Sequence, residues 1–99
     1  MILVRDVFQV KFGHMDKVLS ALEVARQNNP DRPTTLRVLT DVSGNMFTLV
    51  FETKAESVDA HRERMLVAFE DPEMAKAMAE IGQYFESGHR EYYNIEYEA

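Results

Sequence analysis

The sequence has no cysteine and no tryptophan, and only four glycines and three prolines among its 99 residues. The absence of cysteine excludes disulfide bonds, thiolate metal sites and thiol catalysis. No apolar run approaches the roughly 20 residues that a membrane-spanning helix requires. The apolar N-terminal residues follow no basic segment, which is not typical of a secretory signal. We therefore expect a cytoplasmic protein that does not enter a membrane.

Positive charge is also scarce. The chain has 11 Lys and Arg against 17 Asp and Glu, which gives a net charge of −6. Proteins that bind nucleic acids or anionic membranes concentrate Lys and Arg on one face. Here these residues are scattered among acids, so we expect neither nucleic acid nor a membrane surface as a partner.

The remaining composition is that of a globular protein, with 45% apolar and 10% aromatic residues. Such a chain of about 100 residues can form one domain with a modest core. We therefore expect a single domain over residues 1–99.

Four segments alternate apolar and polar residues, which predicts strands, and three have apolar residues at helical spacing. The predicted strands span residues 2–12, 35–42, 46–52 and 89–97, and the predicted helices span 14–27, 53–69 and 71–87. A capping box from Thr53 to Glu56, Asp71 followed by Pro72, and Gly88 mark the helix ends. The order βαββααβ is that of an α+β, ferredoxin-like fold, in which helices cover one face of an antiparallel sheet.

The two faces of the predicted sheet differ in character. The more apolar set is assigned to the helix-covered face and comprises Val4, Phe8, Val10, Phe12, Leu36, Val38, Val42, Phe47, Leu49, Phe51, Tyr93, Ile95 and Tyr97. The opposite face has five sizeable apolar groups among charges, namely Val7, Leu39, Met46, Val50 and Tyr92. A solvated sheet face is normally more polar than this. We expect a second copy of the chain to cover it, because most soluble oligomers are symmetric homodimers.

Residues 5–14, RDVFQVKFGH, form a strand that ends in glycine and leads into a helix with a polar start. This opening resembles NIPSNAP-like and antibiotic-biosynthesis-monooxygenase-like domains of the dimeric α/β-barrel superfamily, as do the paired helices before a tyrosine-rich last strand. The resemblance implies two sheets packed into a shared barrel, with a pocket between each sheet and its own helices. Haem-degrading relatives use a tryptophan that this chain lacks.

Two residues are candidates for proton transfer. His61 shares its helical stripe with Val58, Met65 and Phe69, and a histidine there could act as acid or base near neutral pH. The alternative is a histidine at the core edge, bonded to backbone. Asp6 is the one acid in the apolar set of the first strand, so burial would require an arginine partner, a ligand or a raised pKa. An exposed place near the strand end is the alternative.

Four residues are candidates for ligand binding. Arg37 could form an anion site, although a cross-strand or cross-dimer ion pair is the plainer interpretation. Tyr92, Tyr93 and Tyr97 could orient an aromatic ligand or simply fill space. No two histidines lie three or four residues apart, and we predict neither a metal nor a cofactor.

These observations favour a small-ligand-binding homodimer that is similar to NIPSNAP-like proteins. The alternative is a cofactor-independent, monooxygenase-like enzyme that acts on a small aromatic or polyketide-like substrate, with His61 or Asp6 moving a proton. A module that binds another protein through the open sheet face is a third possibility. Since a fold does not determine a reaction, the sequence leaves open whether the protein is an enzyme.

Overall fold

The computed structural model of the chain describes residues 1–28 and 37–99. The elements in chain order are β1 (Ile2–Val10), α1 (Met15–Asn28), β2 (Arg37–Thr40), β3 (Thr48–Ala55), α2 (Val58–Phe69), α3 (Pro72–Gly82) and β4 (Phe85–Asn94). The strands form one antiparallel sheet in the order β2-β3-β1-β4. The predicted α+β, ferredoxin-like fold is therefore confirmed.

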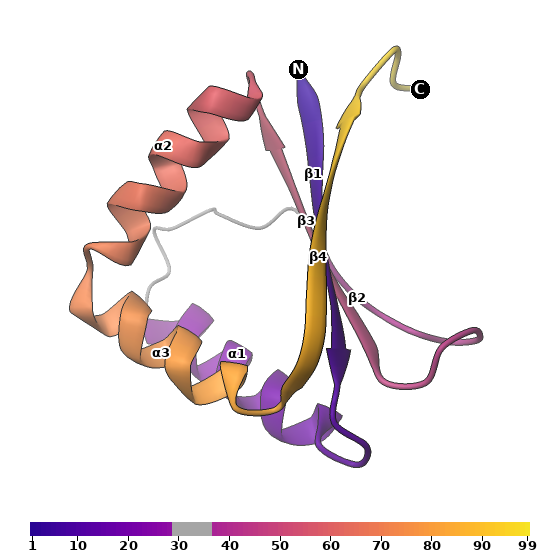
Figure 1. Cartoon of the computed structure of the whole chain (residues 1–99), viewed down its shortest axis with the longest axis vertical. Coiled ribbons are helices and arrows are strands. Elements are labelled where there is room, and N and C mark those ends of the chain that lie inside the picture. The colour runs from indigo at the N-terminus through magenta and orange to yellow at the C-terminus, as the bar shows by residue number, and fades with distance from the viewer. Residues whose placement is uncertain (29–36) are drawn as a thin grey trace.

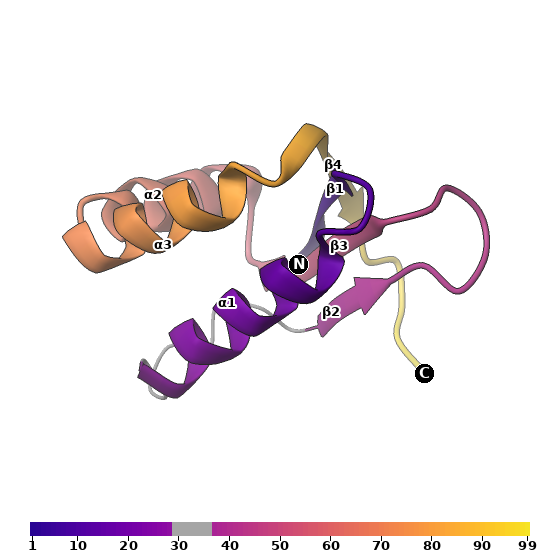
Figure 2. The same ribbon diagram turned by 90° about the horizontal axis from the view of Figure 1, so that it is seen from below.

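All three helices lie on the same side of the sheet, as Figure 1 shows. α1 and α3 lie near the end of the sheet at which β1 ends and β4 begins, whereas α2 lies beside the opposite end (Figures 1 and 2). The helices thus give the sheet a helix-covered face and a helix-free face.

The core consists of two apolar clusters on the helix-covered face. Val10, Val18, Leu49 and Ile81 are buried together and join β1, β3, α1 and α3. A smaller cluster of Ile2, Val4 and Ala55 lies at the other end of the sheet. Even-numbered residues of β1 contribute to both clusters, as the predicted alternation requires.

The prediction of which side chains on the last strand face the helices is wrong by one residue. Val4, which is buried on the helix-covered face, pairs with Tyr92, and Leu3 pairs with Tyr93. Tyr92 therefore lies on the helix-covered face and Tyr93 on the helix-free face, the reverse of the prediction. Two adjacent tyrosines give no hydrophobic signal that fixes the face, so only the register with β1 decides it.

Several predicted element ends also differ from the structure. β1 and β2 end at Val10 and Thr40, so that Phe12 and Val42 are exposed rather than in the core. Leu36, from the same predicted set, lies outside the described residues. Met46 lies in the turn before β3 and is exposed, not on the open sheet face.

The helix caps are partly as predicted. Asp71 caps α3 by accepting a hydrogen bond from the Glu73 backbone N–H, and Pro72 is its first residue. The capping box from Thr53 to Glu56 is wrong, because β3 continues to Ala55 and Ser57 caps α2. Gly88 is also no helix cap. It lies in β4 opposite Phe8, where its missing side chain makes room for the phenylalanine ring.

Candidate functional site

A cluster of four polar residues lies where α2 faces the sheet. Asp6 on β1 and Arg90 on β4 are cross-strand partners, and Tyr92 follows Arg90 on the same face of β4. His61 from α2 meets them from the helix side. Three elements thus bring together residues that are as many as 84 positions apart in the sequence.

Asp6 and Arg90 form a two-pronged ion pair. The Nε and Nη2 atoms of Arg90 donate to the two carboxylate oxygens of Asp6. This hydrogen bonding raises the pKa of Arg90 further above its usual range, with a smaller contribution from the Tyr92 hydroxyl. The sequence placed Asp6 on an apolar face, where its carboxylate would need an arginine partner, a ligand or a raised pKa. The structure supplies the arginine partner, Arg90.

His61 is almost completely buried, with 2% of its surface exposed. Its Nδ1 atom lies 3.5 Å from the Tyr92 hydroxyl, and the two rings meet edge to face with their centroids 5.8 Å apart. Burial lowers the pKa of His61, and the charge of Arg90 lowers it further against the opposing effect of Asp6. At neutral pH the imidazole is therefore uncharged and able to accept or donate a proton.

The sequence singled out His61, Asp6 and Tyr92 but not Arg90. Tyr92 was placed on the wrong face, and Arg90 was not considered. The available signal for Arg90 was the need of Asp6 for a cation, but seven arginines could have met it. Only the register of β1 with β4 selects Arg90.

Arg37, a predicted ligand residue, lies on the helix-free face away from this cluster. It forms an ion pair with Glu52, its cross-strand partner on β3, which also pairs with Arg5 at 3.2 Å. Glu52 is only 4% exposed although no helix covers it. The plainer interpretation of Arg37, a cross-strand ion pair, is therefore confirmed.

Two of the three predicted ligand tyrosines, Tyr93 and Tyr97, lie apart from His61 as well. Tyr93 is on the helix-free face beside Leu3, and Tyr97 lies beyond the end of β4 with its side chain exposed. A surface hollow on this face is lined by Leu3, Arg37, Lys54, Ile95 and Glu98. Arg37 lines it, whereas neither tyrosine does.

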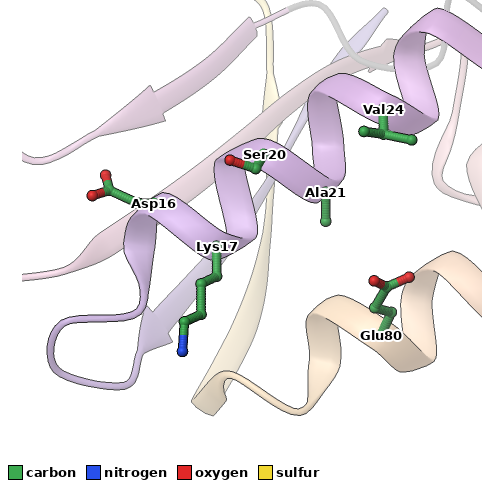
Figure 3. Close-up of a pocket in the computed structure, with 6 residues that line it drawn as sticks. All are labelled: Asp16, Lys17, Ser20, Ala21, Val24 and Glu80. Carbon is green, nitrogen blue, oxygen red and sulfur yellow. The ribbon is translucent and has the colours of Figure 1, made fainter.

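A second hollow lies between α1 and α3 (Figure 3). Ala21 from α1 and Glu80 from α3 point toward the space between the two helices, whereas Asp16 extends to the other side of α1. The other residues that line this hollow are Lys17, Ser20 and Val24. None of the site residues predicted from the sequence lines it.

Within residues 1–28 and 37–99, no group of three or more metal-binding side chains converges on a common point. In the same ranges, no helix has both the length and the apolar character to cross a bilayer.

Two sequence comparisons were negative. No protein-family model matches the chain. No curated protein matches it significantly either.

Solved structures, in contrast, share its fold. A NIPSNAP family protein from Agrobacterium tumefaciens has a TM-score of 0.84 at 16% identity, with 98% of this chain and 88% of that chain covered. A NIPSNAP-like domain protein from Burkholderia xenovorans also has a TM-score of 0.84, at 12% identity, with 99% and 88% covered. A putative antibiotic biosynthesis monooxygenase from Nitrosomonas europaea has a TM-score of 0.70 at 13% identity, with 98% and 100% covered. The predicted resemblance to NIPSNAP-like and monooxygenase-like domains is thus confirmed at the level of the fold.

Proposed function

We propose that this protein is a single-domain, small-ligand-binding homodimer that forms a dimeric α/β barrel. Its two copies join through their helix-free faces, and each binds a ligand between its helices and the helix-covered face. The observation that carries this proposal is the apolar row across the helix-free face. Val7, Val50 and Leu39 are register partners on β1, β3 and β2, so their side chains form one continuous patch. An apolar patch on a sheet face favours a covering partner.

The charges beside this patch suit a covered surface. Arg5 and Arg37 both pair with Glu52, and Arg5 also pairs with Glu91 at 3.1 Å. Two cations and two carboxylates balance, so a partner can cover them without burying a charge that has no counterion. The patch and the balanced charges together support a homodimer through this face.

The ligand side of the proposal is supported by His61. A buried histidine normally satisfies both ring nitrogens. Among the described residues, only the long contact from Nδ1 to Tyr92 is present. Arg90 and Tyr92 are both more than a third exposed and connect this group to the surface. A polar group so placed at the edge of an apolar layer is suited to a small organic ligand.

Native mass spectrometry tests both parts of the proposal. We expect the freshly purified protein to be a dimer, with additional small-molecule mass where a ligand is retained. Val7→Lys places a charge in the apolar row and should yield monomers. Val24→Lys, an exposed position on α1, is the matched control and should remain dimeric. A wild-type protein that is monomeric at micromolar concentration would contradict the dimer.

The alternative is a cofactor-independent, monooxygenase-like enzyme that acts on a small aromatic or polyketide-like substrate. It is favoured by the depressed pKa of His61, because an uncharged imidazole at neutral pH can take a proton from an electron-rich phenol. Asp6 would then hold Arg90 beside the phenolate that forms. Oxygen consumption with a polyphenol substrate such as a hydroxylated anthrone tests this function.

We expect His61→Ala to abolish oxygen consumption if this alternative is correct. His89→Ala is the control, because His89 is a mostly exposed side chain on β4. An active His61→Ala variant would remove His61 from the mechanism. The cytoplasmic location stays a prediction, which cell fractionation tests.

A further inference from the structure

The hydrogen-bond chain at the site has a direction that its chemistry determines. Arginine has five N–H donors and no acceptor. Arg90 donates to the Asp6 carboxylate, and Tyr92 follows it on the same face of β4. Toward His61, Tyr92 is the natural donor, because a phenol O–H is more acidic than a neutral imidazole N–H and an imidazole nitrogen is the more basic acceptor.

The hydrogen of Tyr92 has an acceptor in His61. The Nδ1 atom of His61 lies 3.5 Å from the Tyr92 oxygen. In a neutral imidazole one ring nitrogen accepts and the other carries the hydrogen. If Nδ1 accepts from Tyr92, the hydrogen is on Nε2. No described residue accepts a hydrogen bond from that Nε2 atom.

The charges of the cluster cancel. Asp6 neutralises Arg90 within their ion pair, and burial keeps His61 uncharged at neutral pH. An ionised ligand would have to give up its hydration without gaining a counterion, which is unfavourable. An uncharged molecule with a hydrogen-bond acceptor meets no such penalty.

We propose that Tyr92, beside the Asp6–Arg90 pair, positions His61 with its hydrogen on Nε2, and that this N–H donates to the carbonyl oxygen of an uncharged organic ligand. This inference rests on the proposed ligand site and names its ligand class. In this inference His61 is a hydrogen-bond donor and not a base, because a base would need an Nε2 atom that carries no hydrogen. Tyr92 is a positioning residue, which acts through His61.

The tautomer of His61 can be measured without any ligand. Long-range proton–nitrogen NMR correlations at pH 8 report which ring nitrogen carries the hydrogen. We expect the Nε2–H form in the wild-type protein and a larger share of the Nδ1–H form in Tyr92→Phe. Tyr93→Phe is the matched control, because it removes the same hydroxyl on the helix-free face and should leave the His61 spectrum unchanged. A wild-type Nδ1–H tautomer would overturn the inference, as would a Tyr92→Phe spectrum identical to wild type.

Binding of two small probes tests the ligand class. Acetophenone and ethylbenzene have similar shapes, but only acetophenone has a carbonyl acceptor. We expect the wild-type protein to bind acetophenone about fivefold more tightly, the equivalent of one neutral hydrogen bond. Tyr92→Phe should reduce this preference and Tyr93→Phe should retain it. Equal affinity of the wild-type protein for the two probes would overturn the carbonyl assignment.

The two proposals fail in different ways. If neither probe shifts the His61 resonances, the ligand site between helices and sheet is wrong, and the carbonyl assignment falls with it. If both probes shift them but show no preference, the ligand site stands and the carbonyl assignment is wrong. The tautomer result concerns the hydrogen-bond chain alone and does not depend on either probe.

Discussion

Gly88 and Phe8 show how one residue on an edge strand controls the packing of the core. A Cβ atom on Gly88 would lie 2.6 Å from Cδ1 of Phe8. The Phe8 ring cannot move away freely, because it stacks on Phe85 at 4.4 Å and meets the edge of Phe51. The absence of a side chain at Gly88 is therefore a packing requirement and not a feature of a turn.

We predict that Gly88→Ala lowers the free energy of unfolding by about 1–3 kcal/mol, the usual cost of overpacking. Gly82→Ala is the control, because a Cβ atom there meets no other atom within 4 Å. Urea denaturation of the two variants measures the difference. Equal stability of Gly88→Ala and wild type would show that the Phe8 ring relaxes at no cost.

His61 should make stability depend on pH. Its pKa in the folded protein lies below the usual 6.5, chiefly because of burial. The unfolded chain therefore binds a proton in a pH range where the folded protein does not. The resulting stability is fully present above pH 6.5 and decreases as the pH falls through that value toward the folded-state pKa.

We predict a steeper loss of stability between pH 7 and pH 5.5 for the wild-type protein than for His61→Gln. His89→Gln, which changes a mostly exposed histidine, should keep the wild-type slope. Urea unfolding at several pH values provides the comparison. Identical slopes for wild type and His61→Gln would mean that His61 titrates normally in the folded state.

At the scale of elements, the start of α2 shows how a strand can obscure a helix cap. The residues from Thr53 to Glu56 match a capping box, yet the chain is still extended in β3 as far as Ala55. Ser57 instead accepts a hydrogen bond from the Ala60 backbone N–H at 3.0 Å. The sheet hydrogen bonds of β3 therefore override a local sequence preference.

We predict that Ser57→Ala lowers the free energy of unfolding by about 1 kcal/mol, because a backbone N–H of the first turn loses its acceptor. Glu56→Ala should change it by less than about 0.5 kcal/mol, since its side chain is exposed and would matter only in the capping box. Thermal or urea unfolding separates the two cases. A larger loss of stability in Glu56→Ala than in Ser57→Ala would instead support the capping box.

At the scale of the whole molecule, the helix-free face links stability to assembly. If two copies cover Val7, Leu39 and Val50, unfolding must also separate the copies. We then predict that the Tm of the wild-type protein rises with protein concentration, as mass action requires. Val7→Lys should give a Tm that is lower and independent of concentration. Calorimetry over a 100-fold range of concentration measures both, and a constant wild-type Tm would contradict the dimer.

The sequence by itself determined the order of the elements and the faces of β1, because the period of the apolar residues is a local property. It also marked His61 and Asp6, since a polar residue in an apolar stripe is visible in a single segment. It could not pair Asp6 with Arg90 or place Tyr92 beside His61, because these residues lie in segments far apart in the chain. Their meeting depends on the register between β1 and β4 and on the position of α2 beside the sheet. The tertiary structure alone decided these features, because strand register and helix docking are set by the packing of the whole chain and not by the pattern of any one segment.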